Sequence, residues 1–197
     1  MKLIRTILLV LGVSLLAACS LRPPAPALQG YLLQAARPAA PASTGEALGI
    51  RAAAAVQPFG ERQLVYRESG QRFVQDFYHV YLSPPAENVS TQARHWLSLA
   101  GFAAPADPGA SNLLELRIDA LYIDVRQPKS PAAVIDMNAR LLGPEGDSGR
   151  KLLQQWQLGS RQPLASSDAD SGMQGLDQAL ADTLQQLEAA LAKQPAN

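Results

Sequence analysis

Cysteine is almost absent from this chain, which has a single Cys in 197 residues. One thiol can form neither an internal disulfide nor a cluster of thiolate metal ligands. Aromatic residues are also sparse, at 6%, so any surface for stacking bases or sugars would be small. Charge of one sign is not in excess, because 17 Lys and Arg balance 17 Asp and Glu. Nucleic-acid-binding proteins normally have a basic excess or a basic stripe, and we therefore expect no nucleic-acid partner.

Catalytic signatures are equally scarce. The two histidines, His79 and His95, belong to no HExxH motif, whereas a catalytic zinc usually has three protein ligands. There is no glycine-rich phosphate-binding loop that ends in Lys-Ser/Thr. The string Gly146-Asp147-Ser148-Gly149 resembles the nucleophile motif of trypsin-like proteases, but a turn needs the same residue types, and the chain is too short for the double barrel that such a triad requires. We therefore predict a protein that is not an enzyme and has no cofactor or metal.

The one cysteine lies at the end of an amino-terminal leader. A positively charged start (residues 1–5) precedes an apolar run (residues 7–16), two alanines and Cys19. This order is typical of a signal peptide, and Leu16-Ala17-Ala18-Cys19 resembles the lipobox that lipoprotein signal peptidase recognises. We predict that residues 1–18 are removed and that Cys19 carries fatty-acyl chains such as palmitate. Two alternatives stay open: an ordinary secretory leader, and a transmembrane anchor, for which the run falls short of the roughly 20 residues needed.

Acylation of Cys19 would hold the protein at a membrane, because two or more lipid chains give stable anchoring. Ser20 follows the cysteine, where an Asp would resemble the inner-membrane retention signal. Because Ser20 departs from that signal, the sequence predicts, for a Gram-negative host, a location at the periplasmic face of the outer membrane. Residues 19–27 include three prolines, which favour an extended tether of about 3 Å per residue. Residues 28–194 are long enough for one domain and too short for two.

The first half of the domain predicts short strands and one helix. The strand candidates are residues 31–33, 48–56, 64–67 and 73–82. The second of these is rich in alanine, so a helix stays open there. Gly70 separates the last two, which predicts a hairpin. Pro84 suits a helix N-cap and Pro85 the first helical position, and this helix is expected to end at Gly101.

The second half predicts three longer strands and a closing helix. Residues 113–126 form the longest strand candidate, and the side chains expected on one of its faces are Leu114, Leu116, Ile118, Ala120 and Tyr122. From Leu121 the other face also becomes apolar, so either a bulge lies there or both faces are covered. On a regular pleat, Asp119 and Asp124 would point to opposite faces and could not act as an acid–base pair.

The strands that follow are expected to return as an antiparallel meander. They centre on residues 133–141 and 152–158. Capping residues from Asp168 to Ser171 lead into a stripe from Met173 to Leu191 at helical spacing, and Lys193 and Pro195 close this helix. This order of elements predicts an α+β fold, in which two helices pack on one face of an antiparallel sheet.

These features, in this order, resemble the ABC-type transport auxiliary lipoproteins, a family that includes the lipoprotein of the paraquat-inducible intermembrane system. The matching features are the lipobox, Tyr31-Leu32-Leu33, Leu48-Gly49-Ile50, Leu64-Val65-Tyr66-Arg67, the Pro84-Pro85 helix start, Leu114-Glu115-Leu116 and the closing helix. The family often has a Trp shortly before the double proline, whereas this chain has Tyr81-Leu82-Ser83, so the branch of the family stays open. The resemblance implies a domain similar to the amino-terminal domain of TolB.

The resemblance also implies a function. Such lipoproteins accompany a permease, an ATPase and an Mce-domain substrate-binding protein that move lipids or other hydrophobic molecules across the cell envelope. This chain would be a non-catalytic auxiliary component, with the Mce-domain protein and the ABC transporter subunits as partners; homo-oligomerisation and the transported molecule stay open. Two alternatives remain: a free-standing envelope-assembly lipoprotein that binds protein or peptidoglycan, and a carrier that binds lipid between helix and sheet. Cys19 is the one site residue that the sequence assigns.

Overall fold

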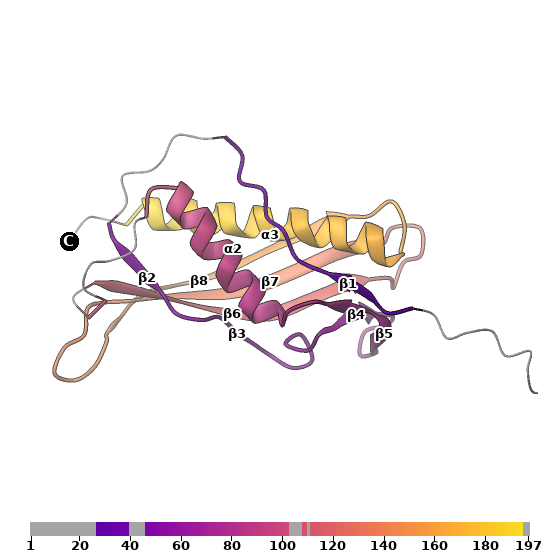
Figure 1. The fold of residues 1–197 in the computed structure, drawn as a ribbon, viewed down its shortest axis with the longest axis horizontal. Helices are drawn as coiled ribbons and strands as arrows, with labels where there is room; N and C mark the ends of the chain where they lie inside the picture. The colour runs from indigo at the N-terminus through magenta and orange to yellow at the C-terminus, as the bar shows by residue number, and fades with distance from the viewer. Residues whose placement is uncertain (1–26, 40–45, 103–107, 110, 195–197) are drawn as a thin grey trace, which may run out of the picture.

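The domain consists of a layer of helices on a layer of strands (Figure 1). The computed structural model describes residues 27–39, 46–102, 108–109 and 111–194. Within these ranges the chain forms one sheet of eight strands, and both helices lie on the same face of it. The predicted α+β class with two helices on one face is therefore confirmed. The predicted signal peptide, Cys19 and all but the last residue of the predicted tether lie outside the described residues.

The short strands come first along the chain, and the three longest strands follow α2. The strands are β1 (Gln29–Tyr31), β2 (Leu48–Ile50), β3 (Ala54–Ala55), β4 (Gln63–Arg67), β5 (Phe73–Tyr81), β6 (Asn112–Asp124), β7 (Ala132–Leu142) and β8 (Leu152–Pro163). The helices are α2 (Pro85–Leu99) and α3 (Ala169–Ala192). Across the sheet the order is β1-β5-β4-β6-β7-β8, and β2 and β3 also pair with β6. Among the described residues, neither helix combines the length and the apolar character needed to cross a bilayer.

The three long strands form the predicted antiparallel meander. β6 pairs with β7 along almost its whole length, and β7 pairs with β8 in the same way. The alternation in β7 places one set of side chains under the helices, as predicted: Ala133, Ile135, Met137, Ala139 and Leu141. The meander therefore supplies most of the surface on which the helices pack.

A bulge in β6 decides which of its side chains reach the helices. The pairing with β7 shifts between Ile118 and Ala120, so the alternation of faces reverses there. The residues that face the helices are Leu114, Leu116, Ile118, Leu121 and Ile123. Ala120 and Tyr122 lie on the other face, in a small cluster with Val65 and Val134. The expectation that Ala120 and Tyr122 share a face with Leu114 was wrong, and the bulge alternative is confirmed.

The sheet is mixed, whereas the sequence predicted only antiparallel pairing. β2, β3 and β4 follow one another along the edge of β6 that β7 leaves open, and all three run parallel to it. β1 is parallel to β5, while β4 and β5 form the predicted antiparallel hairpin. Residues 48–56 form two strands instead of one. At the break between them, the Ala53 N–H donates to the Ser90 hydroxyl of α2 at 2.7 Å.

Both helices begin and end close to the predicted residues. Pro84 is the N-cap of α2 and Pro85 its first residue. The chain turns away at Gly101, whose φ of 94° favours glycine. α3 follows Asp168, whose carboxylate accepts a hydrogen bond from the Ser171 N–H at 2.8 Å. The predicted stripe on α3 is buried along its whole length: Met173, Leu176, Leu180, Leu184, Leu187 and Leu191.

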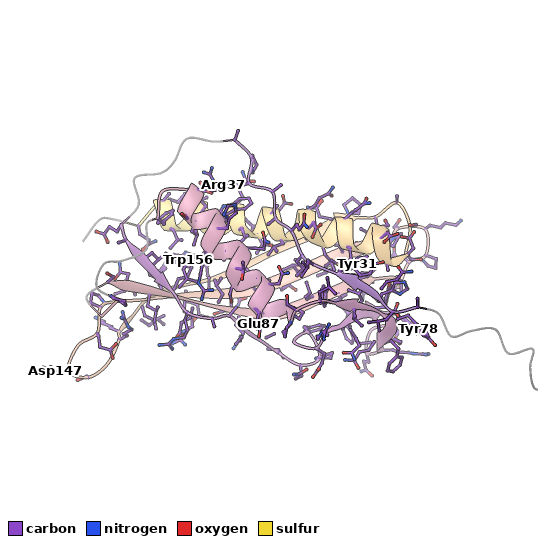
Figure 2. All side chains as sticks on the ribbon, in the orientation of Figure 1. Tyr31, Arg37, Tyr78, Glu87, Asp147 and Trp156 are labelled. Carbon is purple, nitrogen blue, oxygen red and sulfur yellow. The ribbon has the colours of Figure 1, made fainter. Side chains whose placement is uncertain are left out.

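One carboxylate joins both helices to the segment that follows β1. Glu188 of α3 accepts hydrogen bonds from the indole N–H of Trp96 at 2.7 Å and from Arg37 Nη2 at 2.8 Å and Nε at 3.0 Å. The Arg37 side chain is 8% exposed, and its guanidinium holds the pKa of Glu188 below the usual range. The segment after β1 is therefore tied across the helix layer, where Figure 2 shows Arg37 beside α2.

A glycine on α3 allows the helix to approach the sheet closely. A Cβ at Gly175 would lie 2.9 Å from the Ala133 Cβ and would overlap the end of the Leu164 side chain. Leu164 can rotate away, but the Ala133 Cβ is fixed to the backbone of β7. The distance between α3 and β7 therefore depends on Gly175.

We predict that Gly175→Ala lowers the free energy of unfolding by about 1–2 kcal/mol. Overpacking against β7 should exceed the roughly 1 kcal/mol that alanine gains over glycine in a helix. Urea unfolding followed by circular dichroism measures the difference. Gly70→Ala is the control, because a Cβ there meets nothing within 4 Å. Unchanged stability of Gly175→Ala would contradict the close approach.

Candidate functional site at the tether end of the sheet

The described chain begins at one end of the sheet, which we call the tether end. β1 starts there just after Ala27, which is eight residues beyond Cys19. The strand pairings bring three loops to the same end: residues 68–72, 125–131 and 164–168. The loop between β7 and β8 lies at the opposite end (Figure 1). The tether end is therefore the part of the domain closest along the chain to the predicted lipid.

A wide bulge in β5 lies beside β1. The pairing of β4 with β5 is interrupted between Gln63 and Val65, where β5 advances from Gln75 to Val80. Inside the bulge, one oxygen of Asp76 accepts the N–H groups of Tyr78 and His79 at 2.8 and 3.1 Å, and the other lies 2.7 Å from His79 Nδ1. Burial raises the pKa of Asp76, but these hydrogen bonds outweigh it and lower the pKa. The Asp76 carboxylate therefore holds the shape of the bulge.

The bulge presents large apolar side chains to solvent. Phe77 is 74% exposed and Tyr78 is 44% exposed. Leu28, the residue before Gln29, which pairs with His79, is 65% exposed. We call Leu28, Phe77 and Tyr78 the bulge patch. Single exposed apolar residues are common, whereas several at one end of two paired strands are a candidate contact surface.

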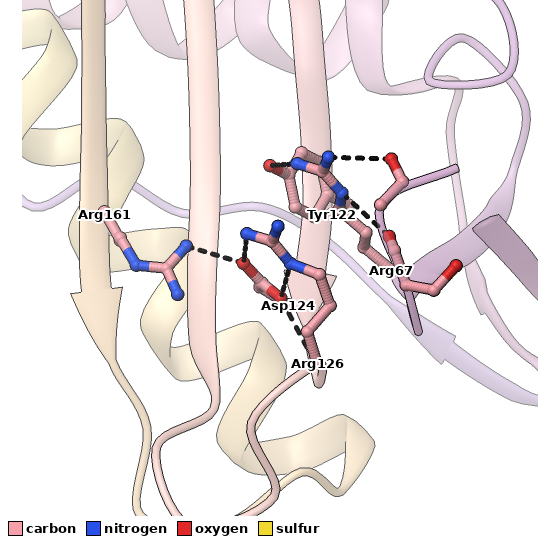
Figure 3. A network of polar contacts seen from close by, with 7 residues as sticks. Arg67, Tyr122, Asp124, Arg126 and Arg161 are labelled. Carbon is pink, nitrogen blue, oxygen red and sulfur yellow. Dashed lines mark hydrogen bonds and ion pairs between the residues drawn. The ribbon is translucent and has the colours of Figure 1, made fainter. Parts of the chain in front are cut away.

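A charged network lies at the end of β6 (Figure 3). Asp124 is 2% exposed and binds Arg126 through both oxygens, with Nε at 2.9 Å and Nη2 at 2.8 Å. Arg161 of β8 adds a third bond from Nη1 at 2.8 Å. The Arg126 guanidinium holds the pKa of Asp124 well below its usual range, against the effect of burial, and Arg161 contributes to the same shift. The carboxylate is therefore ionised at neutral pH and joins β6 to β8.

Next to this network, Arg67 of β4 packs against two aromatic side chains. Arg67 lies over the rings of Phe73 and Tyr122, with its central carbon 5.3 and 5.7 Å from their centres. Its guanidinium donates to the Tyr122 hydroxyl at 3.1 Å and to the Gly70 carbonyl at 3.0 Å. Stacking and hydrogen bonding together use the planar shape of arginine. They hold the turn at residues 68–72 against the end of β6 (Figure 3).

A shallow hollow of about 760 Å³ opens beside Asp124. Its lining includes Arg126, Lys129 and Arg161, so three cations face one carboxylate. We call these three residues the basic hollow. Arginine and lysine in this arrangement suit an anionic oxygen group such as a phosphate or a carboxylate.

The residues considered as catalytic candidates do not come together. His79 is bonded to Asp76, and His95 is exposed on α2. Ser148 lies in the predicted turn between β7 and β8. In the described part of the chain, no three His, Cys, Asp or Glu side chains gather as metal ligands.

The two aspartates of β6 are arranged differently from the expectation. Because the bulge reverses the alternation, Asp119 and Asp124 lie on the same face, away from the helices. Each carboxylate is bound to an arginine of its own strand: Asp119 to Arg117, and Asp124 to Arg126. The two acids therefore act as partners for arginines and not as a pair.

The bulge patch and the basic hollow were not found from the sequence. The aromatic and β-branched run at residues 73–82 predicts one regular strand, in which each side chain has a fixed face. The available signal was Asp76, because an aspartate that bonds to the backbone two residues later makes a local turn inside such a run. Arg126, Lys129 and Arg161 are separated in sequence and show no pattern.

We predict that Asp124→Asn lowers the free energy of unfolding by about 1–2 kcal/mol at pH 7, because the amide loses the charge-assisted bonds to Arg126 and Arg161. The pKa of Asp124 is lower in the folded than in the unfolded state, where it is about 3.9. The stabilisation is therefore complete above about pH 4 and is lost as the pH falls below that value.

Urea unfolding at pH 7 and pH 3 tests this, with the difference between parent and variant expected to shrink at pH 3. Asp119→Asn is the matched control, because its partner Arg117 is largely exposed and such pairs contribute little. Equal effects of the two substitutions at pH 7 would contradict a special role for Asp124.

The comparisons with known proteins concern the fold. No protein-family model matches this sequence, and no curated protein sequence matches it. A crystal structure of a Xanthomonas campestris protein of the DUF330 family superposes with a TM-score of 0.68 at 16% identity, covering 82% of this chain and 92% of that one. A second crystal structure, of an uncharacterized protein, gives a TM-score of 0.59 at 15% identity, with 85% and 97% coverage. This chain therefore shares its fold with that DUF330 protein over most of both chains.

Proposed function

We propose that this chain is a lipoprotein anchored through Cys19 at the periplasmic face of the outer membrane. We further propose that it is a non-catalytic auxiliary component of an Mce-type ABC transport system for lipids or other hydrophobic molecules. The observation that carries the anchoring is Leu16-Ala17-Ala18-Cys19, placed eight residues before the described domain begins. The transport role is supported by the ordered resemblance along the chain and by the fold shared with the DUF330 protein.

The side-chain arrangement supports a binding role without catalysis. Asp124 is neutralised by Arg126 and Arg161, and His79 is bonded to the carboxylate of Asp76. General acid–base chemistry needs a titrating group within reach of a substrate proton, whereas these groups hold the structure of the tether end. The domain would then act as a rigid body that docks with other components.

The packing between helices and sheet favours docking over the carrier alternative. The side chains in this layer are almost fully buried, including Leu114, Ile135, Leu180 and Leu184 at 0–1% exposure. A lipid chain could enter only by displacing them, and protein cores are packed too densely to open without cost. A bound lipid would therefore have to lie outside this layer.

We predict that Cys19→Ala removes the acyl chains and releases the protein from the outer-membrane fraction. The physical reason is that the remaining domain has no long apolar helix among its described residues. Membrane fractionation and mass spectrometry of the amino-terminal peptide measure both effects, and growth should match that of a deletion strain. Ser148→Ala is the control, because the hydroxyl lies in an exposed turn. A parent protein with its leader intact would contradict the anchor.

We predict that affinity purification of the lipidated protein recovers an Mce-domain protein together with ABC transporter subunits. The tagged Cys19→Ala variant is the control and should recover less of both, since it is no longer held at the membrane. Recovery of peptidoglycan or of other envelope proteins alone would contradict the transport role. That result would favour the free-standing assembly lipoprotein.

A further inference from the structure

We propose that the tether end of the domain docks on the lipid bilayer itself. The bulge patch would enter the interfacial layer, and the basic hollow would contact lipid phosphates. This contact rests on the proposed anchoring at Cys19 and adds a second, non-covalent attachment. It would orient the domain relative to the membrane, which a tether alone cannot do.

The first argument is the reach of the tether. Nine residue steps separate Cys19 from Leu28, and an extended chain spans at most about 3.3–3.6 Å per residue, or roughly 30 Å here. β6 alone has 13 residues, which corresponds to about 40 Å. Leu28 must therefore stay close to the acylated cysteine, while the loop between β7 and β8 can lie far from the membrane. The tether end is the end that the anchor holds near the lipid.

The second argument is the chemistry and shape of the bulge patch. Phe77 and Tyr78 are exposed on β5, next to the edge strand β1, and the exposed Leu28 lies one residue before the Gln29–His79 pair that joins these two strands. Aromatic side chains with a polar group, such as tyrosine, favour the boundary between headgroups and acyl chains. Because Asp76 already fixes the backbone of Tyr78 and His79, little ordering is needed when the patch makes contact. The patch is therefore preformed for an interfacial contact.

The third argument is charge. Lys129 and the partly exposed side chains of Arg126 and Arg161 lie around the hollow at the tether end. Asp124, the acidic residue of the hollow, is buried beneath the two guanidinium groups and is neutralised by them. The excess positive charge of the hollow complements the phosphates of anionic lipids, which attract Lys and Arg near the surface.

The test uses the lipidated protein, in which the Cys19 sulfur is acylated, so that an added cysteine is the single free thiol. Tyr78→Cys and Asp147→Cys are each labelled with a nitroxide; Figure 2 shows the two positions at opposite ends of the molecule. The proteins are reconstituted in vesicles of phosphatidylethanolamine and phosphatidylglycerol. Electron paramagnetic resonance then compares collisions with oxygen, which concentrates in the bilayer, and with a water-soluble nickel complex.

The expected result is an oxygen-to-nickel collision ratio several-fold higher at position 78 than at position 147. Leu28→Ser combined with Phe77→Ser should reduce the ratio at 78 towards that at 147. Replacing phosphatidylglycerol with phosphatidylcholine should also reduce it, because the basic hollow loses its anionic partner. Circular dichroism of each labelled protein should match that of the parent.

Equal ratios at positions 78 and 147, in a protein whose mass shows the acyl chains, would overturn the docking and leave the anchor in place. A mass without acyl chains would overturn the anchor, and the docking with it. A high ratio at 78 that does not change with phosphatidylcholine would overturn the role given to Arg126, Lys129 and Arg161.

Discussion

The packing of α3 on the meander β6–β7–β8 is the interaction on which the rest of the structure depends. Its buried stripe, from Met173 to Leu191, covers the apolar side chains of these strands. Each such side chain contributes about 1.5–3 kcal/mol on burial, so this contact supplies the largest part of the core. α2 joins it through Trp96, which bonds to Glu188 of α3, and Arg37 brings the segment after β1 to the same carboxylate. The shorter strands β1 to β5 are then arranged around this packed core of helices and long strands.

The positions of the polar side chains at the tether end depend on the packing of α3 on the meander. The meander determines where β6 and β8 end, and so places Asp124 between Arg126 and Arg161. The carboxylate is buried and therefore requires such partners. Near the edge, where only the short strand β1 lies outside it, β5 departs from regular pairing, and Asp76 stabilises the departure with its own hydrogen bonds. Two surfaces of different chemistry, one apolar and one basic, thus lie at the end of the domain that leads to Cys19.

Sequence patterns predicted which side chains of a strand face the core more successfully than which strands pair with each other. The alternation in β7 identified its buried side chains, because side chains in a strand alternate between two faces. The same alternation does not specify which strand lies beside another or in which direction, so the parallel contacts of β2, β3 and β4 with β6 were not predicted. The bulge near Asp119 was foreseen as one of two alternatives. The pairing with β7 shows that the bulge is present, and the bulge places Ala120 and Tyr122 on the face away from the helices.

The sequence by itself determined the helix boundaries, the buried stripe of α3 and the turn that contains Ser148, since capping, helical spacing and turn residues act between near neighbours in the chain. The lipobox at Cys19 is equally local, and is a prediction from the sequence alone. Only the tertiary structure decided that Gln29 pairs with His79 and that Arg161 reaches Asp124. Residues so far apart in the chain meet through strand pairing, which depends on the packing of the whole core and leaves no pattern in either segment.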